Sequence, residues 1–206
     1  MKINSSLILS EEAINAFWRW FSDHHRDVEA MLDRDDTAEL SRQINAQIDH
    51  LSSQLAWEIG PGLVEPYMFV FPTAGDSERK AAVGRIMEKA PKIERWEFHA
   101  SRPTRPFQRE VQLPDRGLSF QTSDWRFALK PSPQSDRFEL QIFDDRLGSV
   151  EEKTALTAVF ILLDAVLGED MVERWIGNIK VLPASSSRVS LPMPMIAERL
   201  AEVVPQ

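Results

Sequence analysis

The side chains that could do chemistry begin with four histidines, His24, His25, His50 and His99. His25 and Glu29 stand four residues apart on an expected helix and could share a metal ion. A zinc site normally needs a third protein ligand, which His50 or His99 would have to supply. Because no H-E-x-x-H motif is present, solvated or core-bonded histidines are the better interpretation, and we predict no metal site.

Acidic residues are the second set of candidates. Asp144 and Asp145 end an expected strand, where paired acids can hold Mg²⁺ or Ca²⁺, but we favour ordinary turn residues. Asp164 stands inside an apolar stretch, where a carboxylate is costly unless it is hydrogen-bonded or paired. We interpret Asp164 as a structural acid with a partner such as a backbone amide or Arg174. The alternatives are an acid of raised pKa lining a site and an acid that faces solvent.

Motifs that would identify a nucleotide site or a nucleophile are missing. The sequence has no nucleophile elbow, Walker loop or dinucleotide fingerprint, and its 8 glycines form no Gly-rich loop. Cysteine is absent, which excludes disulfides, thiol catalysis and thiolate metal sites. The sequence therefore predicts no catalytic residue and no cofactor.

An aromatic run, Phe17-Trp18-Arg19-Trp20-Phe21, is the clearest candidate for binding. Its helical spacing favours a core-facing stripe with Trp20 on the flank. The alternative is an anchor for a partner protein, because Trp, Phe and Arg are common at interface hot spots. We name Trp18, Trp20 and Arg102 as the candidate partner-binding residues.

Composition narrows the class of partner. The chain has 206 residues, 43% of them hydrophobic, and a formal net charge of −8. This length can bury a substantial core. The negative charge argues against nucleic acid or an anionic membrane as the main partner, since both recruit Lys and Arg. The N-terminal residues lack the apolar region of a secretory signal, so we expect a cytoplasmic protein.

The elements that would position these residues are arranged around an apolar helix at residues 155–167. A capping box of Ser149 and Glu152 is expected to open this helix, and Gly168 to end it. Its residues are apolar almost all round, which predicts a helix covered on more than one side. The run is shorter than the roughly 20 residues of a membrane span.

The first half of the chain predicts a helical hairpin over residues 1–54, with Ser10 and Asp36 as the two N-caps. Strands at 55–59 and 67–71, a helix capped by Asp76 and a strand at 96–100 follow.

The second half begins with an irregular crossing at 101–115 and has the same order of elements. A short strand is expected at 118–121. Strands at 125–130 and 138–143, the apolar helix with an extension at 169–175 and a strand at 176–182 come next. Residues 183–206 are expected to form a linker and a terminal helix.

Two ββαβ-like units, at 55–100 and 117–182, are therefore predicted behind the hairpin. The alternative is that this order of strands and helices arises by chance, as it often does in α+β chains. We expect a single α+β domain over residues 1–206, with a mainly antiparallel sheet covered by helices.

Three patches of sequence resemble a family of uncharacterised bacterial cytosolic proteins. They are the aromatic run at 17–21, the pattern APxxxxWxFxASRP at 90–103, and the segment LDAVLGE at 163–169. The resemblance implies a bacterial cytosolic protein, and it brings no assigned activity and no catalytic residue.

The leading functional hypothesis is a non-enzymatic module that binds another protein; a homo-oligomer is also compatible with the sequence. One alternative is an acidic inhibitor or immunity-type protein that neutralises a basic toxin, which requires Asp and Glu clustered on one surface. The other is a hydrolase that uses Asp164 or the pair Asp144 and Asp145.

Overall fold

The computed structural model describes residues 7–186 and 189–204. Residues 1–6, on which the expected absence of a signal segment partly rests, and 187–188 in the expected linker lie outside the described residues. We expected one domain, but the chain divides into two compact units, Met1–Arg102 and Pro103–Gln206. The division falls where the sequence predicts the irregular crossing to begin. The fold class, α+β with an N-terminal helix pair, is confirmed.

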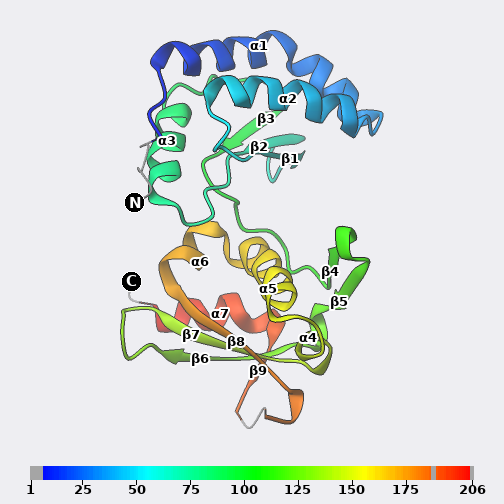
Figure 1. Cartoon of the computed structure of the whole chain (residues 1–206), viewed down its shortest axis with the longest axis vertical. Helices are drawn as coiled ribbons and strands as arrows, with labels where there is room; N and C mark the ends of the chain where they lie inside the picture. Colours follow the sequence, from blue (N-terminus) through cyan, green and yellow to red (C-terminus); the bar gives the residue numbers. More distant parts are fainter. Residues whose placement is uncertain (1–6, 187–188, 205–206) are drawn as a thin grey trace. The chain divides into compact units, whose positions relative to one another are not determined.

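The first unit begins with two antiparallel helices, α1 (Glu11–Asp33) and α2 (Thr37–Leu51) (Figure 1). The Ser10 hydroxyl accepts a hydrogen bond from the amide of Ala13 at 3.1 Å, and Asp36 accepts one from Glu39 at 3.4 Å. These side chains satisfy amides that have no partner within the helix. Both predicted caps and the predicted hairpin are therefore confirmed.

A three-stranded sheet completes the first unit. Its elements are β1 (Glu58–Pro61), β2 (Tyr67–Val70), α3 (Ser77–Met87) and β3 (Trp96–His99). The strand order is β1-β2-β3, with β1 antiparallel and β3 parallel to β2. The first ββαβ unit is therefore confirmed, although its first strand begins at Glu58 and not at Leu55.

Aromatic packing forms the core of this unit. Phe17 and Phe21 of α1 lie edge-on to Phe69 of β2, with ring centroids 6.0 and 5.6 Å apart. Trp18 is buried beside them, and its indole N–H donates to the carbonyl oxygen of Ile86 in α3 at 2.8 Å. Edge-to-face pairs add to the free energy of burying the rings. The helices are thereby held on one face of the sheet.

The second unit contains two further sheets. One is a hairpin of β4 (Glu110–Leu113) and β5 (Leu118–Gln121). The other has the order β8-β7-β6-β9 and is formed by β6 (Arg126–Pro131), β7 (Phe138–Phe143), β8 (Ile176–Leu182) and β9 (Leu191–Pro192). Strand β7 is antiparallel to β6 and parallel to β8, which confirms the second ββαβ unit.

Two predictions about the sheets were wrong. Strands β4 and β9 lie in segments expected to be irregular. One mainly antiparallel sheet was expected, but the described residues form three sheets, and each ββαβ unit has one parallel pair. Antiparallel pairing still predominates, in four of the six pairings between described strands.

The helices of the second unit cover one face of its larger sheet. They are α4 (Asp145–Gly148), α5 (Glu152–Leu167), α6 (Glu169–Trp175) and α7 (Ile196–Val203). Leu162 and Leu163 of α5 share a buried core with Phe127, Leu140 and Ile142 of the sheet. Short 3-10 turns lie at Pro114–Arg116, Thr122–Asp124, Ala184–Ser186 and Met193–Met195.

Helix α5 corrects two further predictions. The capping box does not form, because α4 ends at Gly148 and the Ser149 hydroxyl donates to the carbonyl of Arg146 at 2.7 Å. The helix is also not covered all round: Phe160 and Ile161 are 43% and 40% exposed. When a helix is apolar on every side, its sequence does not indicate which side will pack on the sheet and which side will stay exposed. Gly168 does end the helix, with φ at +80°.

None of the helices within residues 7–186 and 189–204 combines the length and apolar character needed to cross a membrane.

Candidate functional site

A groove runs between the two helices of the N-terminal hairpin. Its volume is about 530 Å³, and both helices line it. Its lining includes Trp20, His24, Asp27, Ala30, Ala46 and Gln47. On α1, positions 20, 24, 27 and 31 follow helical spacing, so one stripe of side chains forms a wall.

Trp20 and His24 form a flat aromatic surface on that wall. Their rings are stacked with centroids 5.3 Å apart and planes 16° apart. The Nδ1 atom of His24 donates to the carbonyl oxygen of Trp20 at 2.8 Å, which holds the imidazole in place. Trp20 is half-buried, so one part of its ring packs on the hairpin while another part faces the groove. A ring in this state can stack on a partner side chain or a cation.

Small residues lie between the two walls. Ala30 of α1 and Ala46 of α2 both line the groove, and Met31 closes it from below as a buried core residue. Small side chains allow another helix to approach closely, since interaxial distances of about 8–10 Å depend on the residues at the contact. The two alanines therefore leave room between the walls.

The α2 wall carries an exposed ion pair. Arg42 makes two hydrogen bonds to the carboxylate of Glu39, at 2.5 and 2.8 Å, and Gln43 donates a third at 2.6 Å. These hydrogen bonds lower the pKa of Glu39 to about 2, with the bond from Arg42 as the largest cause. The same pairing raises the pKa of Arg42. Both side chains therefore keep their charge throughout the physiological range.

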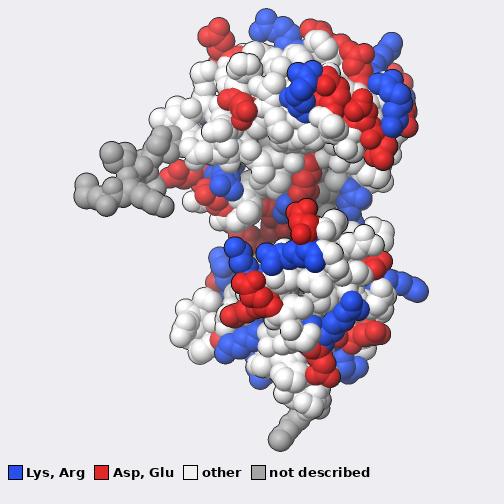
Figure 2. All heavy atoms as spheres, turned by 45° about the vertical axis from the view of Figure 1, so that its right-hand side comes forward, with Lys and Arg blue, Asp and Glu red and all other residues white. Residues whose placement is uncertain are grey.

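The hairpin is strongly acidic. Residues 11–51 contain ten Asp and Glu against four Arg and no Lys, so they carry a net charge of −6 out of −8 for the whole chain. Figure 2 shows acidic atoms gathered where α1 meets α2, with basic atoms beside them. The carboxylate of Asp27, which lines the groove, makes no hydrogen bond or ion pair with the residues that the structure describes. A cationic group entering the groove would find it free.

The other candidate binding residues lie elsewhere. Trp18 is 4% exposed and belongs to the core, which agrees with the core-facing stripe expected for the aromatic run. Arg102 donates to Glu58 of β1 at 2.5 and 2.9 Å. That pair ties the segment after β3 to the sheet edge. Only Trp20 of the three predicted residues lines the groove.

The histidine and Glu29 pair does not form a metal site. The Nδ1 atom of His25 donates to the carbonyl oxygen of Ser22 at 2.8 Å. Glu29 is buried and accepts hydrogen bonds from Arg95 and from the indole of Trp96, both at 2.9 Å. Within the described part of the chain, no three His, Asp or Glu side chains are grouped as metal ligands.

The acidic candidates have structural partners or partial exposure. Asp144 caps α4 by accepting from the amide of Leu147 at 2.7 Å, and Asp145 accepts from the amide of Ala184 at 2.9 Å. This agrees with their interpretation as turn residues. Asp164 is half-buried on α5, and it interacts with another group of the protein.

Sequence reasoning missed the groove, although part of its signal was present. The spacing of Trp20, His24 and Asp27 placed them on one face of α1, but that face was treated as the flank of the core stripe. The matching face of α2 carries Gln43, Ala46 and Gln47, which have no feature that marks a binding surface. Only the packing of the two helices brings these residues together.

The chain matches no family model, no curated protein and no solved structure. The resemblance noted from the three sequence patches therefore stays a prediction.

Proposed function

We propose that the protein is a non-enzymatic binding module that holds a basic, amphipathic helix of a partner protein in the α1–α2 groove. The observation that carries this proposal is the combination, in one groove, of the half-buried Trp20 with the free carboxylate of Asp27.

A helix is the shape that suits this groove. The walls are two antiparallel helices, so a third helix lying between them would complete a three-helix packing arrangement. Recognition of this kind uses anchors at positions i, i+4 and i+7 of the bound helix. Ala30 and Ala46 leave room for a large anchor, and Trp20 offers it an apolar face.

A basic partner is favoured by charge. The net charge of −6 over residues 11–51 attracts Lys and Arg and raises the rate of encounter. Asp27 and the exposed acids around the α1–α2 connection would meet the cationic face of the helix.

The direct test is a titration with a designed amphipathic peptide of about 15 residues, the length of α2, carrying Lys on one face and Leu on the other. We expect saturable binding that weakens as salt is raised, since the attraction is partly electrostatic. A peptide with Glu in place of each Lys serves as the control and should not bind. Equal binding of the two peptides would contradict the proposal.

Two substitutions that change the net charge by the same amount test where the peptide binds. Asp27 and Asp49 are both exposed on the hairpin, but only Asp27 lines the groove. Asp27→Lys should weaken binding of the basic peptide by more than about fivefold, whereas Asp49→Lys should weaken it by less than about twofold. Trp20→Ala should weaken it about tenfold, as expected for an aromatic hot spot.

The acidic inhibitor is a second candidate, favoured by the gathering of acids on the hairpin. It differs in the partner, which would be a whole folded basic protein covered by the acidic surface. An isolated basic helix would then bind weakly, and a folded basic protein tightly, to the same residues. The hydrolase alternative receives less support, because Asp144 and Asp145 use their carboxylates to hold backbone amides.

A further inference from the structure

One edge of the larger sheet in the second unit is open. Strand β6 extends from Arg126 to Pro131, but its outer neighbour β9 has two residues and pairs only with Arg126 and Phe127. No strand of the described residues pairs with β6 beyond Phe127 on this side. An unpaired strand edge can pair with another chain.

The backbone groups of Leu129 point towards the open edge. On this side, the amide of Met193 donates to the carbonyl of Trp125 at 2.9 Å. Because backbone groups alternate in direction along a strand, Phe127 and Leu129 face the same way as Trp125. A continued β9 would place Val189 opposite Leu129, but Val189 is outside β9 and 87% exposed. Proline at position 131 is also typical of an edge strand.

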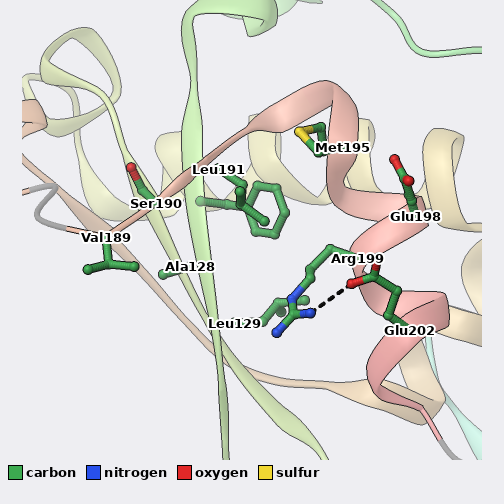
Figure 3. A pocket seen from close by; sticks show the side chains of 10 residues that line it. Ala128, Leu129, Val189, Ser190, Leu191, Met195, Glu198, Arg199 and Glu202 are labelled. Carbon is green, nitrogen blue, oxygen red and sulfur yellow. Dashed lines mark hydrogen bonds and ion pairs between the residues drawn. The ribbon is translucent and has the colours of Figure 1, made fainter.

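A hollow of about 450 Å³ lies beside this edge, between β6 and α7. Figure 3 shows Leu129 on the strand and Arg199 on the helix facing one another across it, with Leu191 nearby. Arg199 is held by an ion pair to Glu202 at 2.7 Å. The floor is apolar, and the polar groups lie along the helix.

A second hollow of about 420 Å³ lies further along β6, towards the β6–β7 turn. We call the two hollows together the track. The second hollow shares Leu129 and Arg199 with the first hollow and adds Pro131, Phe138 and Val203. The two hollows therefore follow β6 on either side of Leu129. Residues i and i+2 of an extended peptide point to one face, so two alternate side chains could occupy them.

The two ends of the track differ in charge. In the first hollow, the carboxylate of Glu198 makes no hydrogen bond or ion pair with any described residue. In the second, the guanidinium of Arg137 is likewise without such a partner among the described residues, while Asp136 beside it is paired with Arg174 at 2.8 Å. One end thus offers an acidic side chain and the other a basic one.

We propose that β6 is extended by strand addition of a partner's peptide segment, which lies antiparallel to β6 with two apolar residues in the hollows. Because β6 runs from the Glu198 end to the Arg137 end, an antiparallel peptide would place an acidic residue before the apolar pair and a basic residue after it. Backbone hydrogen bonds to Leu129 supply the pairing, and the charges select the direction. This inference is independent of the α1–α2 groove.

The test compares two peptides of identical composition, Glu-Val-Thr-Val-Lys and Lys-Val-Thr-Val-Glu, with blocked ends. They are titrated into the full-length ¹⁵N-labelled protein. We expect the first peptide to shift the amide signal of Leu129 and to bind about fivefold more tightly than the second, as two surface charge pairs allow. Equal binding of the two peptides, or no shift at Leu129, would overturn the proposal.

N-methylation of the peptide separates strand pairing from simple filling of the hollows. Methylation of the second valine, whose amide would face Leu129, should abolish binding; methylation of threonine, whose amide faces outwards, should not. The reverse pattern, or no difference, would count against strand addition.

Charge reversal in the protein supplies the matched control. The variant with Glu198→Lys and Arg137→Glu should prefer the second peptide. The variant with Lys153→Glu and Glu152→Lys makes the same exchange at two exposed residues of α5 that line neither hollow, and should keep the original preference. A preference that stays unchanged in the first variant would refute the assignment of the charged ends.

Discussion

At the scale of single residues, Glu97 shows how one carboxylate can shape a loop. Its oxygens accept hydrogen bonds from the amides of Leu63, Val64 and Glu65 at 2.5, 3.1 and 3.3 Å. The Nε2 atom of His99 lies 3.3 Å from Glu97 Oε1, without hydrogen-bond geometry. The loop between β1 and β2 is thereby fixed by a side chain of β3.

This carboxylate should make stability depend on pH. Burial raises the pKa of Glu97, but the three amides and His99 outweigh burial and hold the pKa below its ordinary value of 4.5. The charged form is thus favoured in the fold, so its contribution is present above pH 4.5 and is lost as the pH falls towards the lowered pKa. Glu97→Gln should lower the free energy of unfolding by about 1–3 kcal/mol at pH 7.

Urea unfolding followed by tryptophan fluorescence at pH 7 and pH 3 measures this effect. The difference between wild type and Glu97→Gln should shrink at pH 3, because the wild-type carboxyl takes up its proton as the pH falls towards the lowered pKa. Glu94→Gln, at an exposed position of the same unit, should match wild type at both pH values. A difference that is independent of pH would contradict the role given to the charge.

Gly62 belongs to the same loop and should not tolerate a side chain. A Cβ atom there would lie 2.2 Å from the carbonyl oxygen of Glu65 and 3.0 Å from Glu97 Oε1. Gly62→Ala should therefore cost about 1–3 kcal/mol of unfolding free energy, the usual penalty of overpacking. Gly60 has nothing within 4 Å of such an atom, so Gly60→Ala is the control and should change stability by less than about 0.5 kcal/mol. Equal effects in thermal unfolding would contradict the clash.

At the scale of elements, two similar sequences behave differently at helix starts. Ser10-Glu11-Glu12 caps α1 through the Ser10 hydroxyl, whereas Ser149 lies before α5 without capping it. Ser10→Ala should lower the free energy of unfolding by about 1 kcal/mol, and Ser149→Ala by clearly less. Chemical denaturation of the two variants compares them directly. A larger loss in Ser149→Ala would show that the second cap forms after all.

Helices and strands that are stabilised by local contacts could be predicted from the sequence, whereas those that depend on pairing with another strand could not. The hairpin and both ββαβ units follow from helical periodicity, N-caps and alternating apolar residues, all of which are local signals. Strand β9 has two residues and exists through its pairing with β6, and β4 exists through its pairing with β5. Two residues are too few for β9 to show a pattern, and the alternation of β4 extends over only four residues. The start of α5 was missed because α4 occupies the preceding residues.

The candidate site could be predicted only in part for the same reason. Trp20 was identified from its residue type, and its position on the flank of the α1 core stripe was correct. The contribution of α2 could not be predicted, because Ala46 and Gln47 become part of a groove only when two helices lie side by side. Trp18 lies in the core, and aromatic type alone does not distinguish a core residue from an anchor.

At the scale of the whole molecule, charge and fold are unevenly distributed. The N-terminal hairpin carries six of the eight net negative charges, while the unit Pro103–Gln206 supplies an open strand edge. The two proposed surfaces thus have different chemistry: one is proposed to bind a basic helix and the other an extended segment.

The indole N–H signal of Trp20 is the most direct reporter of the proposed groove. In the full-length ¹⁵N-labelled protein, the basic amphipathic peptide should shift this signal progressively and saturably, and leave the signals of the buried indoles of Trp18 and Trp96 nearly unchanged. Higher salt should reverse the shift. An unmoved Trp20 signal in the presence of bound peptide, or an equal shift with the acidic control peptide, would contradict the proposal that the α1–α2 groove binds a basic helix.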